Sequence, residues 1–346
     1  MFTSQTELED RLTTPSPALV ADLASAGAAG GGDLVVLGAG GKMGPTLAVL
    51  ARRALDAAGR GGDAVHAVSR WSDPAQADRL RAAGVQVVTA DLLDGTDPGL
   101  AALPDGADVL FMVGAKFGSA ASPSWAWAVN AALPDRVARR YAGSRITAFS
   151  TGNVYPLVPI GSQGAAEDHP VGPVGEYAMS CLGRERVLAH GALTRGTPVS
   201  LIRLNYAVDL RYGVLLDLAT TILAGEPVDL TTGHVNVVWQ GYANEVTLRA
   251  MSRATPEVFT LNLTGPEVLP VRRLAERLAA GLGREVTFAG EPAPTALLND
   301  ATRCFDLFGY PDVTAGTLVD WQAGWLAAGL PTSGRPTKWA VRDGRF

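Results

Sequence analysis

The stretch "LVVLGAGGKMGPT", residues 34–46, determines how we interpret the rest of the chain. An apolar run ends in Gly38, Gly41 and Gly44, which have the spacing G-x-x-G-x-x-G, and Gly40 adds a fourth glycine. Missing β-carbons let a backbone turn sharply and approach a pyrophosphate, whose charge is stabilised at the N-terminus of the following helix. The loop therefore predicts a dinucleotide site with contacts from Gly38, Gly40, Gly41, Lys42, Met43 and Gly44.

The Gly-Lys pair in the same loop also suggests a phosphate loop of the nucleoside-triphosphate kind. That interpretation is excluded because Met43 stands where serine or threonine is required, and Val36 stands where the leading glycine is required. Pro45 is compatible with a helix start, since the first turn has no amide hydrogen bond to lose. An apolar strand, a glycine turn and a helix are therefore expected in that order.

Short, nearly continuous apolar runs recur through the first 205 residues, at 34–38, 64–69, 85–90, 108–113, 145–150 and 199–204. Such runs are typical of strands that are covered on both faces. Segments rich in alanine, leucine and arginine, such as 45–58 and 75–84, lie between them and predict helices. Strands separated by helices pair in parallel through right-handed crossovers, so we expect an α/β fold with a doubly wound parallel Rossmann sheet.

The regular alternation stops after Asn205, where helices, short strands and Pro/Gly turns follow less regularly. We expect a dinucleotide-binding domain over residues 1–205, with 236–262 rejoining it. The smaller region 206–346 is expected to pack over the sheet edge and bind the substrate.

The end of the second predicted strand, "VSRWSD", bears on the choice of cofactor. An acidic residue there would accept hydrogen bonds from the ribose of NAD, but Ser69 and Arg70 occupy this place and no acid comes before Asp73. A hydroxyl followed by a guanidinium suits a 2′-phosphate, which favours NADP over NAD; alternatively, Arg70 stacks on the adenine or lies in solvent. Asp91 and Leu92, after the third strand, are expected beside the adenine.

The composition limits the classes of partner. A net charge of −5 without a basic cluster gives no reason to expect nucleic acid or an anionic membrane. Two distant cysteines, Cys181 and Cys304, fit a reducing compartment. The acidic N-terminus does not resemble a signal peptide, and no apolar run reaches the roughly 18–20 residues of a membrane span, so a cytoplasmic protein is expected. The histidines show no ligand spacing and predict no metal site: His66, His169, His190 and His234.

Four further segments carry a resemblance to a known family: "STGNVYP" (150–156), "GEYAMSC" (175–181), "RLNYAVDLRYG" (203–213) and "NLTGPEVLPVRRLAERL" (262–278). Together with the glycine loop, they resemble the extended short-chain dehydrogenase/reductases of the NAD-dependent epimerase/dehydratase kind, over most of the chain. The resemblance implies hydride transfer to or from nicotinamide on a sugar or nucleotide sugar. It also implies a homodimer.

The same resemblance assigns roles by position. Tyr177 is implied to exchange a proton with the substrate, and the Thr151 hydroxyl is implied to hold the same oxygen. Further residues on the cofactor are expected to be Val113, Gly114, Lys116, Asn130, Tyr177 and Asn205. Residues on the substrate are expected to be Asn153, Tyr206, Arg211, Tyr212 and Gln240, although Arg211 could equally pair with a neighbouring carboxylate.

The chain departs from the family motif Tyr-x-x-x-Lys at Cys181. In the family, the lysine binds the nicotinamide ribose and lowers the pKa of the tyrosine. A phenol with an ordinary pKa near 10 is protonated about a thousandfold more often than not at neutral pH, and a thiol supplies no positive charge. Three cations could substitute: oxidised nicotinamide, Lys116, or Arg184 two turns along the same helix. We favour Lys116 as the catalytic substitute, while contact with solvent or a phosphate is its alternative role.

Two functions follow. The first is an NAD(P)-dependent epimerase, dehydratase or reductase; the alternative is a redox-silent NADP(H)-binding sensor that tolerates a degenerate active site. Cys181 is expected to be a small buried filler. Trp125 and Trp127, on a predicted helix, are expected to pack in the core rather than to stack on a ligand.

Overall fold

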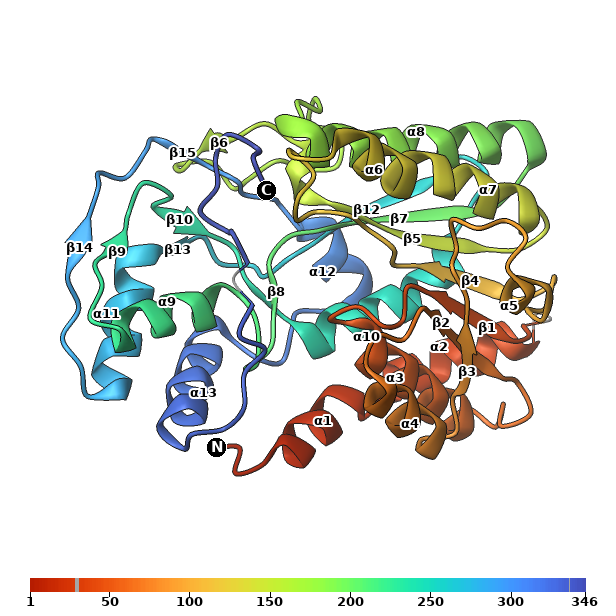
Figure 1. The fold of residues 1–346 in the computed structure, drawn as a ribbon, viewed down its shortest axis with the longest axis horizontal. Coiled ribbons are helices and arrows are strands. Elements are labelled where there is room, and N and C mark those ends of the chain that lie inside the picture. Colours follow the sequence, from red (N-terminus) through yellow and green to blue (C-terminus); the bar gives the residue numbers. More distant parts are fainter. Residues whose placement is uncertain (29–30, 336) are drawn as a thin grey trace.

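The computed structural model describes residues 1–28, 31–335 and 337–346, and at its centre is a seven-stranded parallel sheet (Figure 1). The strand order is β12-β7-β5-β4-β1-β2-β3, and each neighbouring pair is parallel. The strands are β1 (Leu34–Leu37), β2 (Val65–Ser69), β3 (Gln86–Thr89), β4 (Asp108–Phe111), β5 (Ile146–Thr151), β7 (Val199–Leu204) and β12 (Phe259–Leu263). The predicted doubly wound α/β fold is confirmed.

The direction of strand addition reverses at β1. From β1 the chain adds β2 and β3 on one side, and then β4, β5 and β7 on the other. Loops that leave β1 and β4 therefore diverge, and ligands of such sheets bind at the carboxyl ends of the strands at this point. The glycine loop leaves β1 at that edge.

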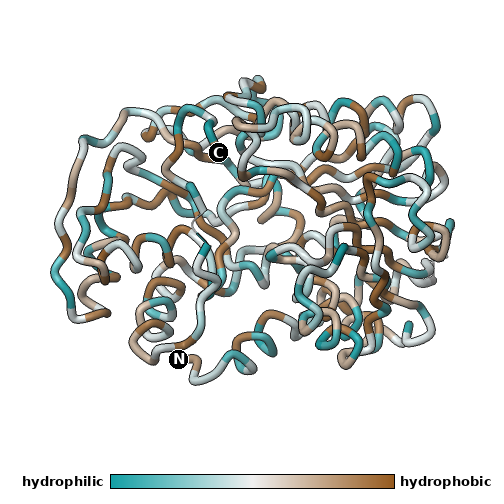
Figure 2. The backbone as a smooth tube through the Cα atoms, viewed as in Figure 1, coloured by the Kyte–Doolittle hydropathy of each residue, from teal (hydrophilic) through white to brown (hydrophobic). Residues whose placement is uncertain are grey.

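Both faces of the sheet are covered, which explains the continuous apolar runs of the strands. Alternate residues of β1 pack into two different hydrophobic cores. Val36 packs into the larger core, and Val35 and Leu37 pack into the smaller one. Figure 2 shows the brown, hydrophobic strands inside layers with more teal. One layer holds α2 (Pro17–Ala28), α3 (Gly44–Ala57), α4 (Pro74–Ala82) and α10 (Gln240–Arg249); the other holds α6 (Pro123–Trp127), α7 (Leu133–Arg140) and α8 (Gly175–Arg195).

The residues after β7 form most of a second, smaller cluster of elements, although β12 returns to the sheet beside β7. Its helices are α9 (Val214–Leu223), α11 (Val271–Leu282) and α13 (Ala315–Ala327), which pack on one another. Short two-stranded pairs surround them: β6 (Val158–Pro159) with β15 (Thr295–Ala296), β8 (Ala207–Val208) with β11 (Val238–Trp239), β9 (Val228–Asp229) with β14 (Phe288–Ala289), and β10 (His234–Val235) with β13 (Leu269–Pro270). The remaining helices are α1 (Gln5–Thr13), α5 (Pro98–Ala101) and α12 (Thr302–Phe308).

Helix α8 is fixed to the sheet by a buried ion pair. Arg203 on β7 meets Glu185 on α8 in two contacts, Nη2–Oε2 at 2.8 Å and Nε–Oε1 at 3.0 Å, with side chains only 9% and 4% exposed. The Ser150 hydroxyl at the end of β5 donates to the same carboxylate at 2.6 Å, and Arg203 also donates to the Tyr155 hydroxyl at 2.6 Å. Strands β5 and β7 therefore hold the helix in one position.

The two tryptophans of α6 do not pack in the core, so that prediction is wrong. Trp125 is 47% exposed and Trp127 is 41% exposed. Helix α6 has one turn, and Ala126 is its only buried residue. Trp127 lies over Gly183 of α8, and its indole N–H donates to Glu176 at 2.7 Å.

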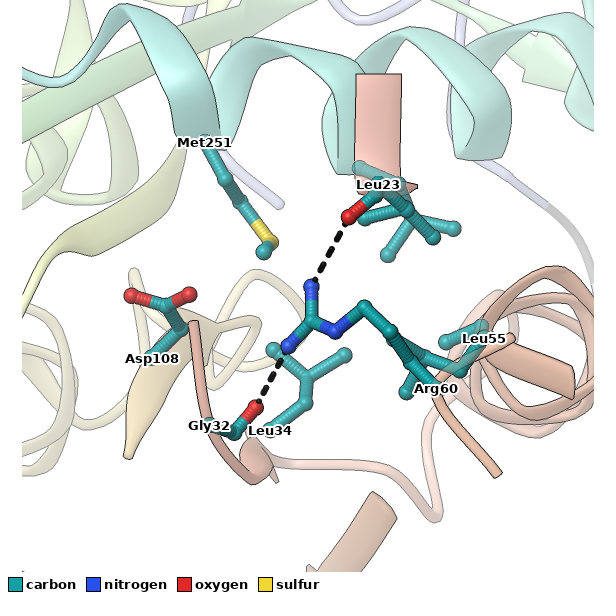
Figure 3. Close-up of a pocket in the computed structure, with 9 residues that line it drawn as sticks. Leu23, Gly32, Leu34, Leu55, Arg60, Asp108 and Met251 are labelled. Carbon is teal, nitrogen blue, oxygen red and sulfur yellow. Dashed lines mark hydrogen bonds between the residues drawn. The ribbon is translucent and has the colours of Figure 1, made fainter. Parts of the chain in front are cut away.

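A small cavity lies at the opposite edge of the sheet from the glycine loop (Figure 3). Leu34 and Asp108, which begin β1 and β4, form part of its wall, and Arg60 crosses it to the carbonyl oxygens of Leu23 and Gly32. Its volume of about 10 Å³ has room for at most a water molecule. This cavity is therefore no candidate for a ligand site. Among the described helices, none combines the length and hydropathy that crossing a membrane requires.

The first prediction concerns the ion pair that fixes α8. Glu185→Ala leaves the Arg203 guanidinium buried without its carboxylate, and we expect a loss of about 3–5 kcal/mol in the free energy of unfolding. Asp320→Ala is the matched control, because its pair with Arg277 is 52% and 56% exposed and is expected to contribute below about 1 kcal/mol. Urea unfolding measures both, and equal small losses would contradict the assigned role of Glu185.

Candidate functional site

The glycine loop is held tightly between β1, β4 and α3. Gly38 has φ +88°, and a β-carbon there would lie 2.9 Å from the Val113 nitrogen. A β-carbon at Gly44 would clash with the main chain of Ala39. Side chains at these two positions would force the loop open, so glycine is required there. The tight turn leaves Gly41 and Lys42 exposed where α3 begins.

The end of β2 lies against the same loop. Gly40 has no room for a β-carbon because the Ser69 side chain packs against it. Arg70 follows and is exposed, and within the described ranges its side chain has no ion-pair or hydrogen-bond partner. Asp91 lies partly buried after β3, where its Oδ1 accepts from the Leu93 N–H at 3.0 Å. A glycine-rich turn at a helix N-terminus, flanked by these residues, fits the adenosine diphosphate half of a dinucleotide.

Tyr177 lies in the first turn of α8, close to Thr151 at the end of β5. Burial raises the pKa of the Tyr177 phenol above its ordinary value, and the neighbouring Cys181 raises it further. The Thr151 hydroxyl and the Arg184 guanidinium act in the opposite direction and only partly offset the rise. The phenol is therefore protonated throughout the neutral pH range.

Cys181 is buried, as expected, in an apolar cluster that includes Val154 and Leu298. Burial raises the pKa of its thiol, whereas Arg184 and its contact with Tyr177 lower it. The thiol is neutral near pH 7 and supplies no positive charge to the phenol.

Of the two protein cations predicted to replace the motif lysine, Arg184 lowers the pKa of Tyr177. Its guanidinium is buried and donates to the carbonyl oxygen of Phe149 at 2.5 Å and to both oxygens of Asn130 at 3.0 and 3.2 Å. Lys116 lies beside the ring of Tyr177 instead, with Nζ 6.0 Å from the ring centroid. Desolvation lowers the pKa of Lys116 to about 8, which Asp217 only partly opposes.

Asn130 connects the loop after β4 to α8. Its amide group exchanges hydrogen bonds with the main chain of Ala115 at 2.8 and 3.0 Å and donates to the Ser180 hydroxyl at 2.9 Å. The side chain is completely buried. Asn130 therefore positions Val113, Gly114 and Lys116 against the helix that carries Tyr177.

Two residues predicted on the substrate, Asn153 and Tyr206, and one predicted on the cofactor, Asn205, lie near this group. Asn153 exchanges hydrogen bonds with the Thr151 hydroxyl at 3.1 and 3.2 Å. Asn205 is buried against Gly152, and its amide donates to the Leu297 carbonyl at 3.3 Å. Tyr206 has φ +42°, and its hydroxyl donates to the Trp339 carbonyl at 3.0 Å.

Two predicted substrate residues are held elsewhere. Arg211 is bound to the carboxylates of Asp209 and Glu9, each at 3.0 Å, which matches the alternative of a neighbouring carboxylate. Gln240 is completely buried, and its amide donates to Thr46 of α3 at 3.0 Å, so it belongs to the contact between α10 and α3.

Lys42 of the glycine loop lies against Tyr212, a further residue predicted on the substrate. Lys42 Nζ is 4.7 Å from the centroid of the Tyr212 ring and donates to the Ala207 carbonyl at 2.7 Å. The side chain keeps contact with solvent, but the surrounding protein desolvates its ammonium group and lowers its pKa to about 8.

Two other features of the site carried no signal in the sequence. Asn299 is buried against Gly152, and within the described residues neither atom of its amide has a hydrogen-bond partner. The segment 337–346 reaches the site from the far end of the chain, and the Phe346 ring lies edge-on to Tyr177 with centroids 5.4 Å apart. Neither segment carries a motif, and both arrive through long-range packing. In the described part of the chain, no group of three or more His, Cys, Asp or Glu residues could hold a metal ion.

Comparisons with known proteins give structural matches only. No family model matches the chain, and neither does any curated protein. UDP-glucuronic acid 4-epimerase from Bacillus cereus, in complex with NAD, matches with a TM-score of 0.68 and 15% identity over 85% of this chain and 99% of that one. UDP-glucose 4-epimerase from Thermotoga maritima, with UDP-glucose, matches with a TM-score of 0.67 and 15% identity over 85% and 98%.

A short-chain dehydrogenase/reductase superfamily protein from Agrobacterium tumefaciens, with bound NAD, matches with a TM-score of 0.67 and 19% identity over 84% of this chain and 96% of that one. Likeness at such identities concerns the fold. These matches show that the chain shares the fold of these proteins, in agreement with the resemblance of its glycine loop and tyrosine segment.

Proposed function

We propose that the chain is an NAD(P)-dependent oxidoreductase of the epimerase/dehydratase type that acts on a nucleotide sugar. The observation that carries the proposal is the position of Tyr177 and Thr151, which lie together at the carboxyl edge of the sheet from which the glycine loop also leaves. Structural neighbours with NAD, UDP-glucose and UDP-glucuronic acid support the same class of ligand.

The raised pKa of Tyr177 supports a role as proton donor. Nicotinamide, when bound, supplies or accepts the hydride. The protonated phenol donates a proton to the substrate oxygen, and the Thr151 hydroxyl holds that oxygen by a hydrogen bond. Because the phenol is protonated at neutral pH, carbonyl reduction is favoured there. Alcohol oxidation requires the phenolate and becomes faster as the pH rises.

Two finer assignments belong to the proposal. Arg184, two turns along the same helix, replaces the motif lysine as the cation that stabilises the phenolate of Tyr177, without touching the substrate. Ser69 and Arg70 bind the 2′-phosphate of NADP, since Arg70 is exposed beside the loop and bound to no other described residue.

The second candidate is a redox-silent NADP(H)-binding sensor. The neutral thiol at position 181 and the raised pKa of Tyr177 favour it, because a protein without turnover has no need of a reactive phenol. Turnover separates the two functions, whereas cofactor binding does not.

Tyr177→Phe tests the enzyme directly. Removal of the proton donor is expected to lower turnover of UDP-glucose or UDP-glucuronic acid with NAD(P) by about 10²–10⁴-fold, while cofactor affinity is retained. Tyr310→Phe, at a tyrosine that is 71% exposed, is the control and should leave turnover unchanged. Nicotinamide absorbance and product analysis follow the reaction. Absence of turnover in the unsubstituted chain, with NADP(H) still bound, would support the sensor instead.

Arg184→Met tests the replacement cation through the pH profile. Removal of a positive charge near the phenol raises the pKa of Tyr177 further, so the basic limb of alcohol oxidation should move to higher pH. Arg184→Lys retains the charge and should move the basic limb part of the way back to its original pH. Urea unfolding of both variants separates this effect from lost stability, and a basic limb that does not move would remove Arg184 from the mechanism.

Arg70→Ala tests the cofactor preference. Loss of a charged hydrogen bond to phosphate, about 1.5 kcal/mol, should weaken NADP binding roughly tenfold and leave NAD binding unchanged. Arg81→Ala, on the exposed side of α4, is the matched control. Calorimetry with both cofactors measures the effect, and equal changes for NAD and NADP would contradict the assignment.

A further inference from the structure

Residues 337–346, which we call the strap, cross the middle of the molecule. In Figure 1 the dark-blue end of the chain leaves α13 and runs towards β6 and the start of α8. The strap contains no helix or strand, and residues 331–335, all exposed, tether it to the rest of the chain. Its position therefore depends on contacts with other elements rather than on structure of its own.

Oxygen atoms of the strap main chain accept hydrogen bonds from donors around the site. The donors come from three separate segments and comprise one ammonium group, two hydroxyls and one amide. The bonds are Lys116 Nζ to Thr337 at 3.2 Å, Tyr206 hydroxyl to Trp339 at 3.0 Å, Thr232 hydroxyl to Ala340 at 3.0 Å, and Gly118 N–H to Phe346 at 3.1 Å. These groups would suit the hydroxyl and phosphate oxygens of a nucleotide sugar equally well.

Phe346 covers the proposed proton donor. Its ring is 4% exposed and lies edge-on to Tyr177, and Lys116 Nζ lies 4.5 Å from its centroid. A substrate oxygen that accepts the Tyr177 proton has to come within hydrogen-bond distance of the phenol. The aromatic ring therefore occupies space beside the residue that the substrate has to reach.

We propose that the strap is a built-in competitor: it occupies the substrate side of the site, its carbonyl oxygens take the donors that a nucleotide sugar would use, and it leaves when the ligand binds. The identity of the ligand rests on the proposed function. The position of the strap against Tyr177 and the surrounding donors does not, because its own contacts show it.

The strap crosses α8 where two glycines meet. Gly344 has φ +73° and Gly175 has φ +80°, and a β-carbon on Gly344 would clash with the Val174 carbonyl. Gly344→Ala is therefore expected to lift the strap without altering any donor of the site. Gly334→Ala is the matched control, because Gly334 has φ +62° and no atom within 4 Å of its added β-carbon. The two variants share the backbone strain and differ in the clash.

The first measurement uses no ligand. Hydrogen exchange followed by mass spectrometry should show at least about tenfold faster exchange over residues 337–346 in Gly344→Ala, with the sheet unchanged. Hydroxyl-radical footprinting should show increased oxidation of Tyr177 in the same variant. Gly334→Ala should resemble the unsubstituted chain in both measurements. Unchanged exchange and footprint in Gly344→Ala, or faster exchange throughout the sheet, would overturn the proposal.

The second measurement adds NAD and UDP-glucose. If the strap competes, calorimetry should show that Gly344→Ala binds UDP-glucose about tenfold more tightly than Gly334→Ala. The reason is that the strap has left the site in a larger fraction of the Gly344→Ala molecules. The ligand should also accelerate exchange of the strap in the unsubstituted chain. Weaker binding by Gly344→Ala, or slower exchange of the strap on binding, would show that the strap helps to hold the ligand. Either result would contradict the proposal. If no form binds UDP-glucose, the proposed function fails. The footprint of Tyr177 still shows whether the strap covers this residue.

Discussion

The buried pair between Glu185 and Arg203 is the constraint on which the rest of the site depends. An ion pair at this depth is costly to desolvate, so it persists only with its geometry and its extra hydrogen bonds from Ser150 and to Tyr155 intact. Arg184, the preceding residue, reaches the Phe149 carbonyl on the same strand. Two successive residues of α8 thus fasten the helix to the end of β5, and the position of Tyr177 beside Thr151 follows from that attachment.

Fastening α8 in this way also explains how the chain tolerates cysteine at position 181. In the proposed mechanism, the positive charge comes from Arg184 instead of the residue one turn after Tyr177, and its guanidinium is bound to three main-chain and side-chain oxygens. A cation held by other partners stabilises a phenolate less than a free lysine does, and burial dominates. The structure therefore suits proton donation by Tyr177 better than proton removal.

The parts of the structure that could be predicted are those that the sequence determines locally. Apolar runs and the glycine loop defined six strands and the start of α3, because parallel strands covered on both faces leave a continuous signature. The sequence favoured Lys116 over Arg184 and carried no signal for the burial of Arg184 against Asn130, a contact across 54 residues. Periodicity placed the α6 tryptophans on a helix but could not tell which face another element covers. The strap carried no signal, since its partners are spread over the whole chain.

The strap and the desolvated lysine address the same physical difficulty. A site built to bind an oxygen-rich ligand contains donors that are costly to leave unpaired when the ligand is absent. Lys116, with a pKa lowered to about 8 by desolvation, is such a donor, and Thr337 supplies the oxygen that it needs. Tyr206, Thr232 and Gly118 are satisfied in the same manner by other strap carbonyls. Because each bond to the strap replaces one that a ligand could make, the closed state stabilises the empty site and sets the affinity threshold that a substrate has to exceed.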